Sequence, residues 1–176
     1  MQTITIIAIA AAAAAAITGA ILYIGPLAIT NDPAIEQQEL VVGGANLSDS
    51  GYRQVNVTVN NVTLVADIAA TNEQRTKGLS VKDTLNEDEG MLFVFSTARE
   101  HSFWMKNMKF PIDIIWISEH HEVVHIEHSL EPCKPDSFCP TYKPDRNALY
   151  VLETVAGFAQ KYNVTENDYV DFQLEE

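Results

Sequence analysis

Short runs of β-branched and aromatic residues, separated by turn-forming residues, constrain the fold of this chain more than any other feature. The stretch VNVTVNNVTLVADI alternates apolar and polar residues on both sides of Asn60-Asn61. A period of two is typical of half-buried strands, and consecutive Asn residues tolerate the positive φ of a tight turn. The stretch therefore predicts a β-hairpin that turns at residues 60–61.

Six further runs predict strands, because they are rich in β-branched and aromatic residues. They are MLFVF (91–95), SFWM (102–105), IDIIWI (112–117), EVVHIEH (122–128), ALYVLE (148–153) and DYVDF (168–172). Two short helices are predicted as well: one follows the capping-box pair Thr71 and Gln74 and stops at Gly78, and the other is TVAGFAQKY (154–162). The fold class is therefore α+β and mostly β, with a small barrel-like antiparallel or mixed sheet and two short helices.

The N-terminal segment is different, because residues 1–31 carry no charged side chain. As a helix, the 22 residues from Thr3 to Ile24 would span roughly 33 Å, enough to cross a bilayer core. No Lys or Arg precedes the run, and the run is long for a secretory signal, so an uncleaved transmembrane helix is favoured over a cleaved signal sequence. The predicted organisation is an anchor or signal sequence at 1–29, a flexible tether at 30–53 and a globular domain at 54–176.

The net charge of −13 falls entirely on the residues after the uncharged run. Nucleic acids need a basic protein surface, so this balance predicts no nucleic-acid partner. Neither a Gly-rich phosphate loop nor the G-x-S-x-G pattern of a nucleophilic serine occurs. We therefore expect no cofactor, and a binding role is favoured over an enzymatic one.

Two features predict that the domain faces an oxidising compartment. Cys133 and Cys139 are the only cysteines and lie in the Pro-rich stretch EPCKPDSFCP, which suits a disulfide. Four N-x-S/T sequons add a little support. The predicted location is the cell membrane, crossed once by residues 3–24, with the C-terminal domain extracytoplasmic and able to meet protein partners in a membrane complex.

The stretch HEVVH contains the H-E-x-x-H pattern of zinc hydrolases, with His121, Glu122 and His125 in the ligand and base positions. On a helix the two His side chains would lie about 5–6 Å apart, but on a strand about 13 Å apart, too far to share a zinc with bonds of about 2.1 Å. The β-branched Val123 and Val124 favour a strand. A zinc metallohydrolase therefore remains the alternative function, and no metal site is the main expectation.

A series of short motifs runs in order along the domain. They are RTKGL (75–79), GMLFVF (90–95), FWMKN (103–107), Pro111-Ile112-Asp113, VLE (151–153) followed by Ala156 and Gly157, and Asp168-Tyr169-Val170. In these motifs the chain resembles the DUF192 family of small bacterial and archaeal domains of unknown function, over about residues 55–173. The family usually has Met where Ser80 stands, Thr where Met108 stands and often Gly where Asn167 stands. The resemblance implies one compact, mostly β domain in which HHEVVHI forms a hairpin and strand.

The family-matching residues suggest one ligand pocket with an aromatic wall and a few polar groups, as small-molecule sites tend to have. The candidate ligand-binding residues are Arg75, Phe103, Trp104, Asn107, Asp113 and Glu153. A structural alternative is that Arg75 forms an ion pair with Asp113 or Glu153 and so holds the first helix on the sheet. The predicted function is a membrane-tethered extracytoplasmic binding or accessory module. A further alternative is a structural accessory subunit of a larger membrane complex.

Overall fold

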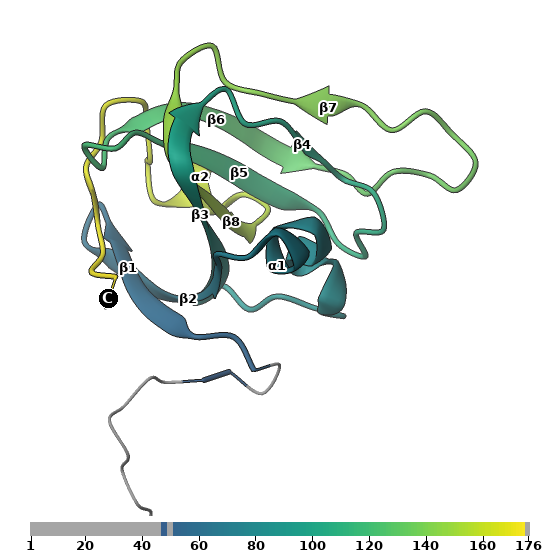
Figure 1. The fold of residues 1–176 in the computed structure, drawn as a ribbon, viewed down its shortest axis with the longest axis horizontal. Coiled ribbons are helices and arrows are strands. Elements are labelled where there is room, and N and C mark those ends of the chain that lie inside the picture. The colour runs from purple at the N-terminus through teal and green to yellow at the C-terminus, as the bar shows by residue number, and fades with distance from the viewer. Residues whose placement is uncertain (1–46, 49–50, 175–176) are drawn as a thin grey trace, which may run out of the picture. The chain divides into compact units, whose positions relative to one another are not determined.

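Seven strands form one curled sheet in the computed structural model of the chain, which describes residues 47–48 and 51–174 (Figure 1). Their order across the sheet is β6-β5-β8-β3-β2-β1-β9, and β4 and β7 form a separate two-stranded ribbon. The elements are β1 (Gln54–Val59), β2 (Val62–Ala69), α1 (Asn72–Lys77), the 3₁₀ helix η1 (Gly78–Val81), β3 (Glu89–Arg99), β4 (Phe103–Trp104), β5 (Ile112–Ile117), β6 (Val123–Leu130), β7 (Thr141–Tyr142), β8 (Ala148–Val155), α2 (Phe158–Lys161) and β9 (Val170–Asp171). The predicted class, a mostly β domain with a barrel-like mixed sheet and two short helices, is confirmed.

The β1–β2 hairpin turns where the two Asn residues predicted it. Asn60 and Asn61 both take positive φ, 48° and 64°, which is the conformation that a two-residue hairpin turn needs. The ladder runs from Val59 opposite Val62 to Gln54 opposite Asp67. This register places Val57 and Val59 in the core and leaves Asn56 and Thr58 on the other side of the strand.

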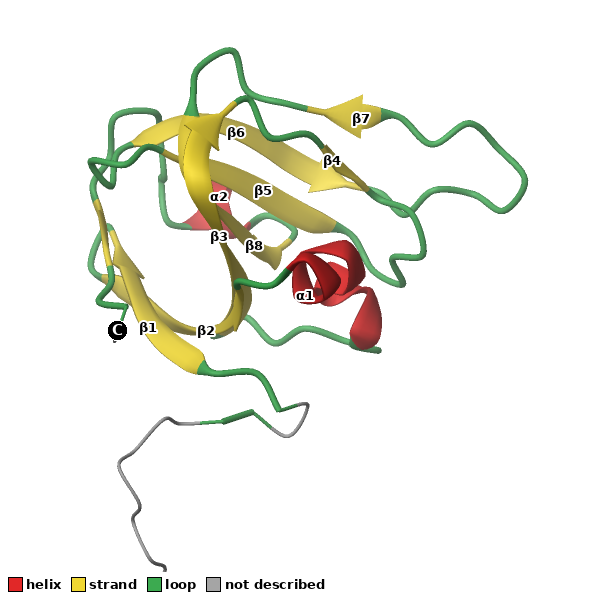
Figure 2. Cartoon of the chain, in the orientation of Figure 1, coloured by secondary structure: helices red, strands yellow, loops and turns green. Residues whose placement is uncertain are grey.

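The connection from β2 to β3 is a crossover, because these two strands pair in parallel. It contains α1, whose N-terminus carries the predicted capping box: Thr71 accepts a hydrogen bond from the Gln74 backbone N–H, and the Gln74 side chain accepts one from the Thr71 backbone N–H. The helix ends at Gly78, which takes φ 50°. Figure 2 shows α1 standing beside the sheet at this crossover.

Both faces of the sheet are buried, because the central strands alternate between two separate apolar clusters. On β3, Leu92 packs in one cluster, while Met91 and Phe93 pack in the other. The first cluster includes Phe158 of α2, and the second includes Leu79 of η1. This double burial explains why IDIIWI is buried at every position of β5.

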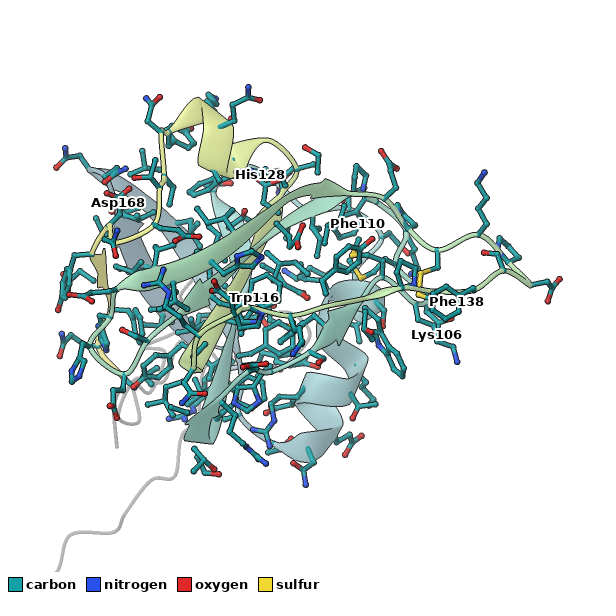
Figure 3. The ribbon with its side chains drawn as sticks, turned by 90° about the horizontal axis from the view of Figure 1, so that it is seen from above. Lys106, Phe110, Trp116, His128, Phe138 and Asp168 are labelled. Atoms are coloured by element: carbon teal, nitrogen blue, oxygen red, sulfur yellow. A yellow bond between two sulfur atoms is a disulfide. The ribbon has the colours of Figure 1, made fainter. Side chains whose placement is uncertain are left out.

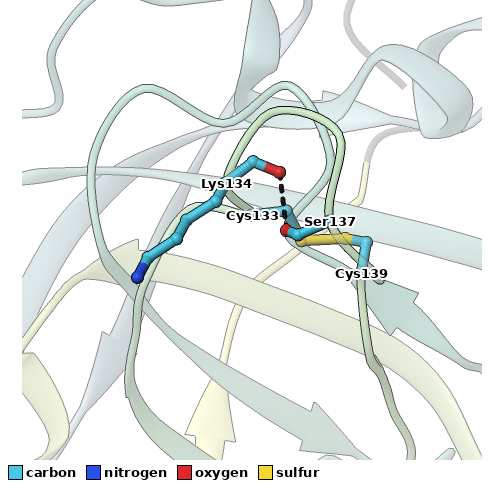
Figure 4. The surroundings of a disulfide bond; sticks show 4 residues. All are labelled: Cys133, Lys134, Ser137 and Cys139. Carbon is cyan, nitrogen blue, oxygen red and sulfur yellow. Dashed lines mark hydrogen bonds between the residues drawn. A yellow bond between two sulfur atoms is a disulfide. The ribbon is translucent and has the colours of Figure 1, made fainter.

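The ribbon of β4 and β7 continues into a loop that a disulfide closes. Cys133 and Cys139 are bonded, with their Cα atoms 5.4 Å apart, as predicted (Figure 4). The Cys133 backbone N–H also donates to the Met105 carbonyl at 3.1 Å, which holds this loop against the residue that follows β4. Phe138 lies exposed in this loop, away from Trp116 in the middle of the domain (Figure 3).

The last described segment connects the two edges of the curled sheet. Val170 and Asp171 pair with Val59 and Thr58 of β1. Just before them, Asp168 and Asn167 exchange backbone hydrogen bonds with Val123 at the start of β6, at 2.9 and 2.8 Å. Residues 167–171 therefore bridge β1 and β6 and give the sheet its barrel-like closure.

The structure corrects several details of the predicted elements. The second helix covers only Phe158–Lys161, since Thr154 and Val155 belong to β8. The short strand β7 was not predicted, and β3 runs from Glu89 to Arg99, beyond both ends of the predicted strand at 91–95. The predicted anchor at 1–29 and most of the tether lie outside the described residues; within the described ranges, no helix is long and apolar enough to span a bilayer.

Candidate functional site

A pocket of about 460 Å³ opens between α1 and η1 on one side and the β4–β7 ribbon on the other. Its walls include the rings of Phe93, Phe95 and Phe103, and Trp104 lies at its rim with 52% of its surface exposed. Phe103 packs edge-to-face on Phe93, with the ring centres 4.9 Å apart. This volume and this apolar lining are in the range of small-molecule sites.

The floor of the pocket holds the carboxyl group of Glu153. The alternation of β8 turns this side chain to the same face as Val151, into the cluster that contains Phe93. Glu153 is only 4% exposed, and its Oε2 atom has no hydrogen-bond partner among the described residues. Burial raises the pKa of Glu153 to about 8, and a hydrogen bond from the Leu79 backbone N–H opposes this only in part. At neutral pH the carboxyl group is therefore mainly protonated and uncharged.

Gly78 allows the approach of η1 to this carboxyl group. A Cβ atom at Gly78 would lie 3.3 Å from the Phe93 ring and 4.0 Å from Glu153 Oε2, at a backbone φ of 50° that strains any other residue. Gly90 has a related role on the opposite side of Glu153, since a Cβ there would lie 2.8 Å from the Glu153 backbone oxygen. The two glycines of the RTKGL and GMLFVF motifs thus surround the same buried residue.

Arg75 lines the pocket from α1 without a carboxylate partner among the described residues. Its guanidinium donates to the Ala70 carbonyl, to the Val94 carbonyl at 2.8 Å and to the side chain of Asn72 at 2.6 Å, and its Cζ lies 5.1 Å from the centre of the Phe95 ring. The predicted ion pair with Asp113 or Glu153 is therefore wrong: Arg75 joins helix to sheet through neutral carbonyl groups, and its positive charge stays uncompensated.

The charged residues that line this pocket are mainly basic, whereas the chain as a whole is acidic. Arg75, Lys77 and Lys106 line it, while Glu153 is the only acid among the described residues of its lining. Lys77 is paired with Glu73 at 2.8 Å on the surface, and the Lys106 Nζ lies 5.7 Å from the centre of the Trp104 ring. With Glu153 protonated, the pocket is cationic in a protein of net charge −13.

His101 belongs to the aromatic wall of the pocket. Its ring stacks on Phe95 with centroids 3.5 Å apart, and burial lowers the pKa of the imidazole below its usual value. His101 also accepts from the indole N–H of Trp116 through its backbone oxygen, at 2.9 Å. A neutral His101 therefore belongs to the apolar lining and adds no charge at neutral pH.

A family model described as "DUF192: Uncharacterized ACR" matches residues 55–172 of this chain. The chain belongs to the DUF192 family. The function of this family is not known, so the match establishes the kind of domain and leaves its activity to be argued from the site.

Two solved structures resemble this DUF192 domain. One is a proposed transcription regulator from Sinorhizobium meliloti 1021, with a TM-score of 0.62 and 25% identity over 69% of this chain and 95% of that one. The other is a protein of unknown function from Novosphingobium aromaticivorans DSM 12444, with a TM-score of 0.61 and 27% identity over 74% of this chain and 94% of that one. No curated protein matches the chain.

Asp113 of the DUF192 domain lies on the other face of the sheet from the pocket. Its carboxylate accepts three backbone N–H groups, from Ser129 at 2.7 Å, Gly157 at 3.0 Å and Ala159 at 2.8 Å. These bonds hold the start of α2 against β5 and β6. Asp113 is thus a buried structural acceptor, and the structure does not bring it together with the other candidates.

Asn107 is also separate from the pocket lining. It takes φ 63° in the turn that the Met108 N–H closes on the Met105 carbonyl at 3.4 Å. An Asn tolerates this left-handed conformation better than most residues, which accounts for its place in FWMKN.

Of the six predicted ligand-binding residues, the structure brings four into one pocket: Arg75, Phe103, Trp104 and Glu153.

The HEVVH stretch is a turn followed by a strand, as the family resemblance implied. His121 takes φ 64° in the turn, while His125 lies on β6. His121 stacks on Phe172 with centroids 4.1 Å apart, and His125 instead lies 3.3 Å from Glu127 and packs on Trp116. The helical geometry that the zinc alternative needs is absent here, and within the described ranges no group of three or more His, Cys, Asp or Glu side chains is placed to hold a metal.

Sequence reasoning missed Lys106, His101, Ser80 and Met108 as pocket residues. Two of them, Ser80 and Met108, stand where the chain differs from the usual family pattern, and these differences could have indicated that both residues line the pocket. The third difference has another reason: Asn167 takes φ 73°, a conformation that Gly adopts without strain and Asn tolerates.

Proposed function

We propose that this DUF192 domain is a binding module that captures a small organic ligand in the pocket between α1 and the β4–β7 ribbon. The observation that carries the proposal is the unpartnered carboxyl oxygen of Glu153 at the floor of an aromatic pocket. A buried polar atom without a partner costs stability, of the order of 1–3 kcal/mol. A ligand that supplies the missing partner recovers part of that cost.

The proposed setting is the outer side of a membrane, where residues 3–24 tether the domain and leave it free to meet other proteins. The uncharged run and the Cys133–Cys139 disulfide support this setting. One solved relative is described as a proposed transcription regulator. The net charge of −13 argues against direct contact with DNA phosphates in this chain.

Recovery of a native ligand tests the binding proposal. Full-length protein is extracted from native membranes in mild detergent, and the small molecules released on denaturation are identified by mass spectrometry. Ser102→Trp adds bulk at an exposed position of the pocket lining, while Ser137→Trp adds the same bulk in the disulfide loop.

We expect one compound to accompany the parent protein and the Ser137→Trp control and to be lost from Ser102→Trp. Equal recovery from all three proteins would place the compound elsewhere, and no enriched compound in any of them would count against a binding module. The proposed setting is tested separately: protein that alkaline carbonate washes off the membrane, or a domain that external protease cannot reach in intact cells, would contradict it.

A further inference from the structure

Two groups in the pocket lining suit partners of different kinds, and they meet β3 at different positions. Glu153 Oε2 is a buried hydroxyl donor when protonated, and Arg75 is a cation with no acid beside it among the described residues. The first group calls for a hydrogen-bond acceptor. The second calls for an anion.

The strand register gives the spacing of the two backbone positions at which these residues meet β3. Glu153 pairs with Met91 across β8 and β3, and Arg75 donates to the carbonyl of Val94, three residues farther along β3. At about 3.3 Å per residue these points are about 10 Å apart along the sheet. Phe93 lies between them on the pocket face.

We propose that the pocket takes an elongated organic carboxylate, and this inference rests on the proposed binding function. The carboxylate lies at the Arg75 end, where guanidinium N–H groups suit its two oxygens. An apolar body packs on the Phe93 and Phe103 rings. At the far end an ether, carbonyl or hydroxyl oxygen accepts the hydrogen bond that Glu153 Oε2 donates.

Because Glu153 is the hydrogen-bond donor, binding of the carboxylate should depend on pH. Once Glu153 loses its proton it can no longer donate, and its charge repels an anion. The charged and titratable groups facing it in the lining are Arg75 and Lys77 from α1, His101 before β4 and Lys106 after it, while β3 and β5 contribute apolar neighbours. Burial lowers the pKa of His101 and the Glu73 carboxylate raises that of Lys77, so neither of these groups changes charge between pH 7 and 9, whereas Glu153 does.

Three aromatic probes separate the parts of this inference. 6-Methoxy-2-naphthoate carries both the carboxylate and the distant acceptor, 2-naphthoate lacks the acceptor, and 6-methoxy-2-naphthamide lacks the charge. Each is titrated calorimetrically into full-length protein in non-ionic detergent at pH 7 and pH 9, with empty micelles as the reference. We expect 6-methoxy-2-naphthoate to bind most tightly at pH 7 and about 10-fold more weakly at pH 9, because only the protonated fraction of Glu153 is competent.

Substitutions then test the donor role of Glu153 and the contribution of positive charge in the lining. Glu153→Gln keeps a donor at every pH, so its affinity for 6-methoxy-2-naphthoate should be equal at pH 7 and pH 9; Glu153→Leu should bind both naphthoates equally. Lys106→Gln should weaken the two carboxylates and leave the amide unchanged, whereas Lys161→Gln, the same charge change on α2, should alter none of them. Thermal melts establish that each variant is folded before it is titrated.

The outcomes distinguish this inference from the binding function on which it rests. If the amide binds as tightly as the carboxylate, the pocket binds organic ligands but the anion assignment is wrong. If Glu153→Gln keeps the pH dependence of the parent, Glu153 is not the donor. If none of the three probes binds, the inference is overturned, while recovery of a native compound of another class would still support the binding module.

Discussion

Replacing Glu153 by Gln should stabilise the domain, and the gain should grow with pH. Burial raises the pKa of Glu153 to about 8, from 4.5 for an exposed carboxyl group. Below pH 4.5 both the folded and the unfolded chain hold the proton, so the carboxyl group brings no pH-dependent loss of stability. As the pH rises from about 4.5 through 8, the unfolded chain releases its proton while the folded chain retains it, and folding loses free energy.

The size of the effect follows from the same pKa. Each pKa unit corresponds to about 1.36 kcal/mol, so the loss in the parent protein is about 3 kcal/mol at pH 7 and approaches about 5 kcal/mol at pH 9. The Gln amide does not titrate and fits nearly the same space. The free energy of unfolding of Glu153→Gln should therefore exceed that of the parent by a margin that is small at pH 5 and about 5 kcal/mol at pH 9.

Urea unfolding of the full-length protein at pH 5, 7 and 9, followed by the fluorescence of the buried Trp116, measures this margin. Glu87→Gln is the matched control, because hydrogen bonds from Lys161 and Tyr162 lower the pKa of the exposed Glu87. It should show no gain that increases with pH. A Glu153→Gln margin that is the same at pH 5 and pH 9 would refute the buried protonated carboxyl group.

Three other substitutions test the scaffold. Asp113→Asn removes the negative charge and places an amide N–H against one of the three backbone N–H groups that Asp113 accepts, so we expect about 1.5–3 kcal/mol of destabilisation in urea unfolding. The control, Asp171→Asn on the exposed side of β9, should be near-neutral. A near-neutral Asp113→Asn would contradict the role of Asp113 as a buried acceptor. Gly90→Ala places a methyl group 2.8 Å from a backbone oxygen of β8, so the melting temperature should fall by several degrees, and an unchanged melt would contradict the close approach. Unreduced protein should show no reactive thiol at Cys133 or Cys139, and reduction should cost about 2 kcal/mol for so short a loop; two thiols in protein from its native compartment would contradict the bond.

Local patterns predicted the parts of this fold that depend on neighbours in sequence. The Asn60-Asn61 turn needs only two residues that tolerate positive φ, and the α1 start needs only the Thr71 and Gln74 pair. The strand cores were found for the same reason, since β-branched and aromatic residues mark them wherever they pair. The strand β7 carries no such run, and it exists because Phe103 and Trp104 of β4 give it a partner.

The candidate site was predicted in part, because side-chain direction depends on pairing and alternation that the motif series does not contain. Asp113 and Trp116 are an odd number of residues apart on β5 and so point to opposite faces, which removes Asp113 from the pocket. Arg75 was expected to meet an acid, but the crossover brings it to backbone carbonyls instead. The protonated state of Glu153 depends on burial by η1, a long-range contact that no local pattern encodes.

The bridge made by residues 167–171 bears on how the chain reaches this fold. Thr58 pairs with Asp171 at a sequence separation of 113 positions, so one of the first strands is completed by one of the last. Contacts of such long sequence separation form slowly, since a large loop must close before they contribute. During synthesis from the N-terminus, β1 and β6 would keep unpaired edges until the final residues arrive, and unpaired edges are where chains associate. The acidic charge of the domain would then oppose association of an intermediate whose sheet is still open.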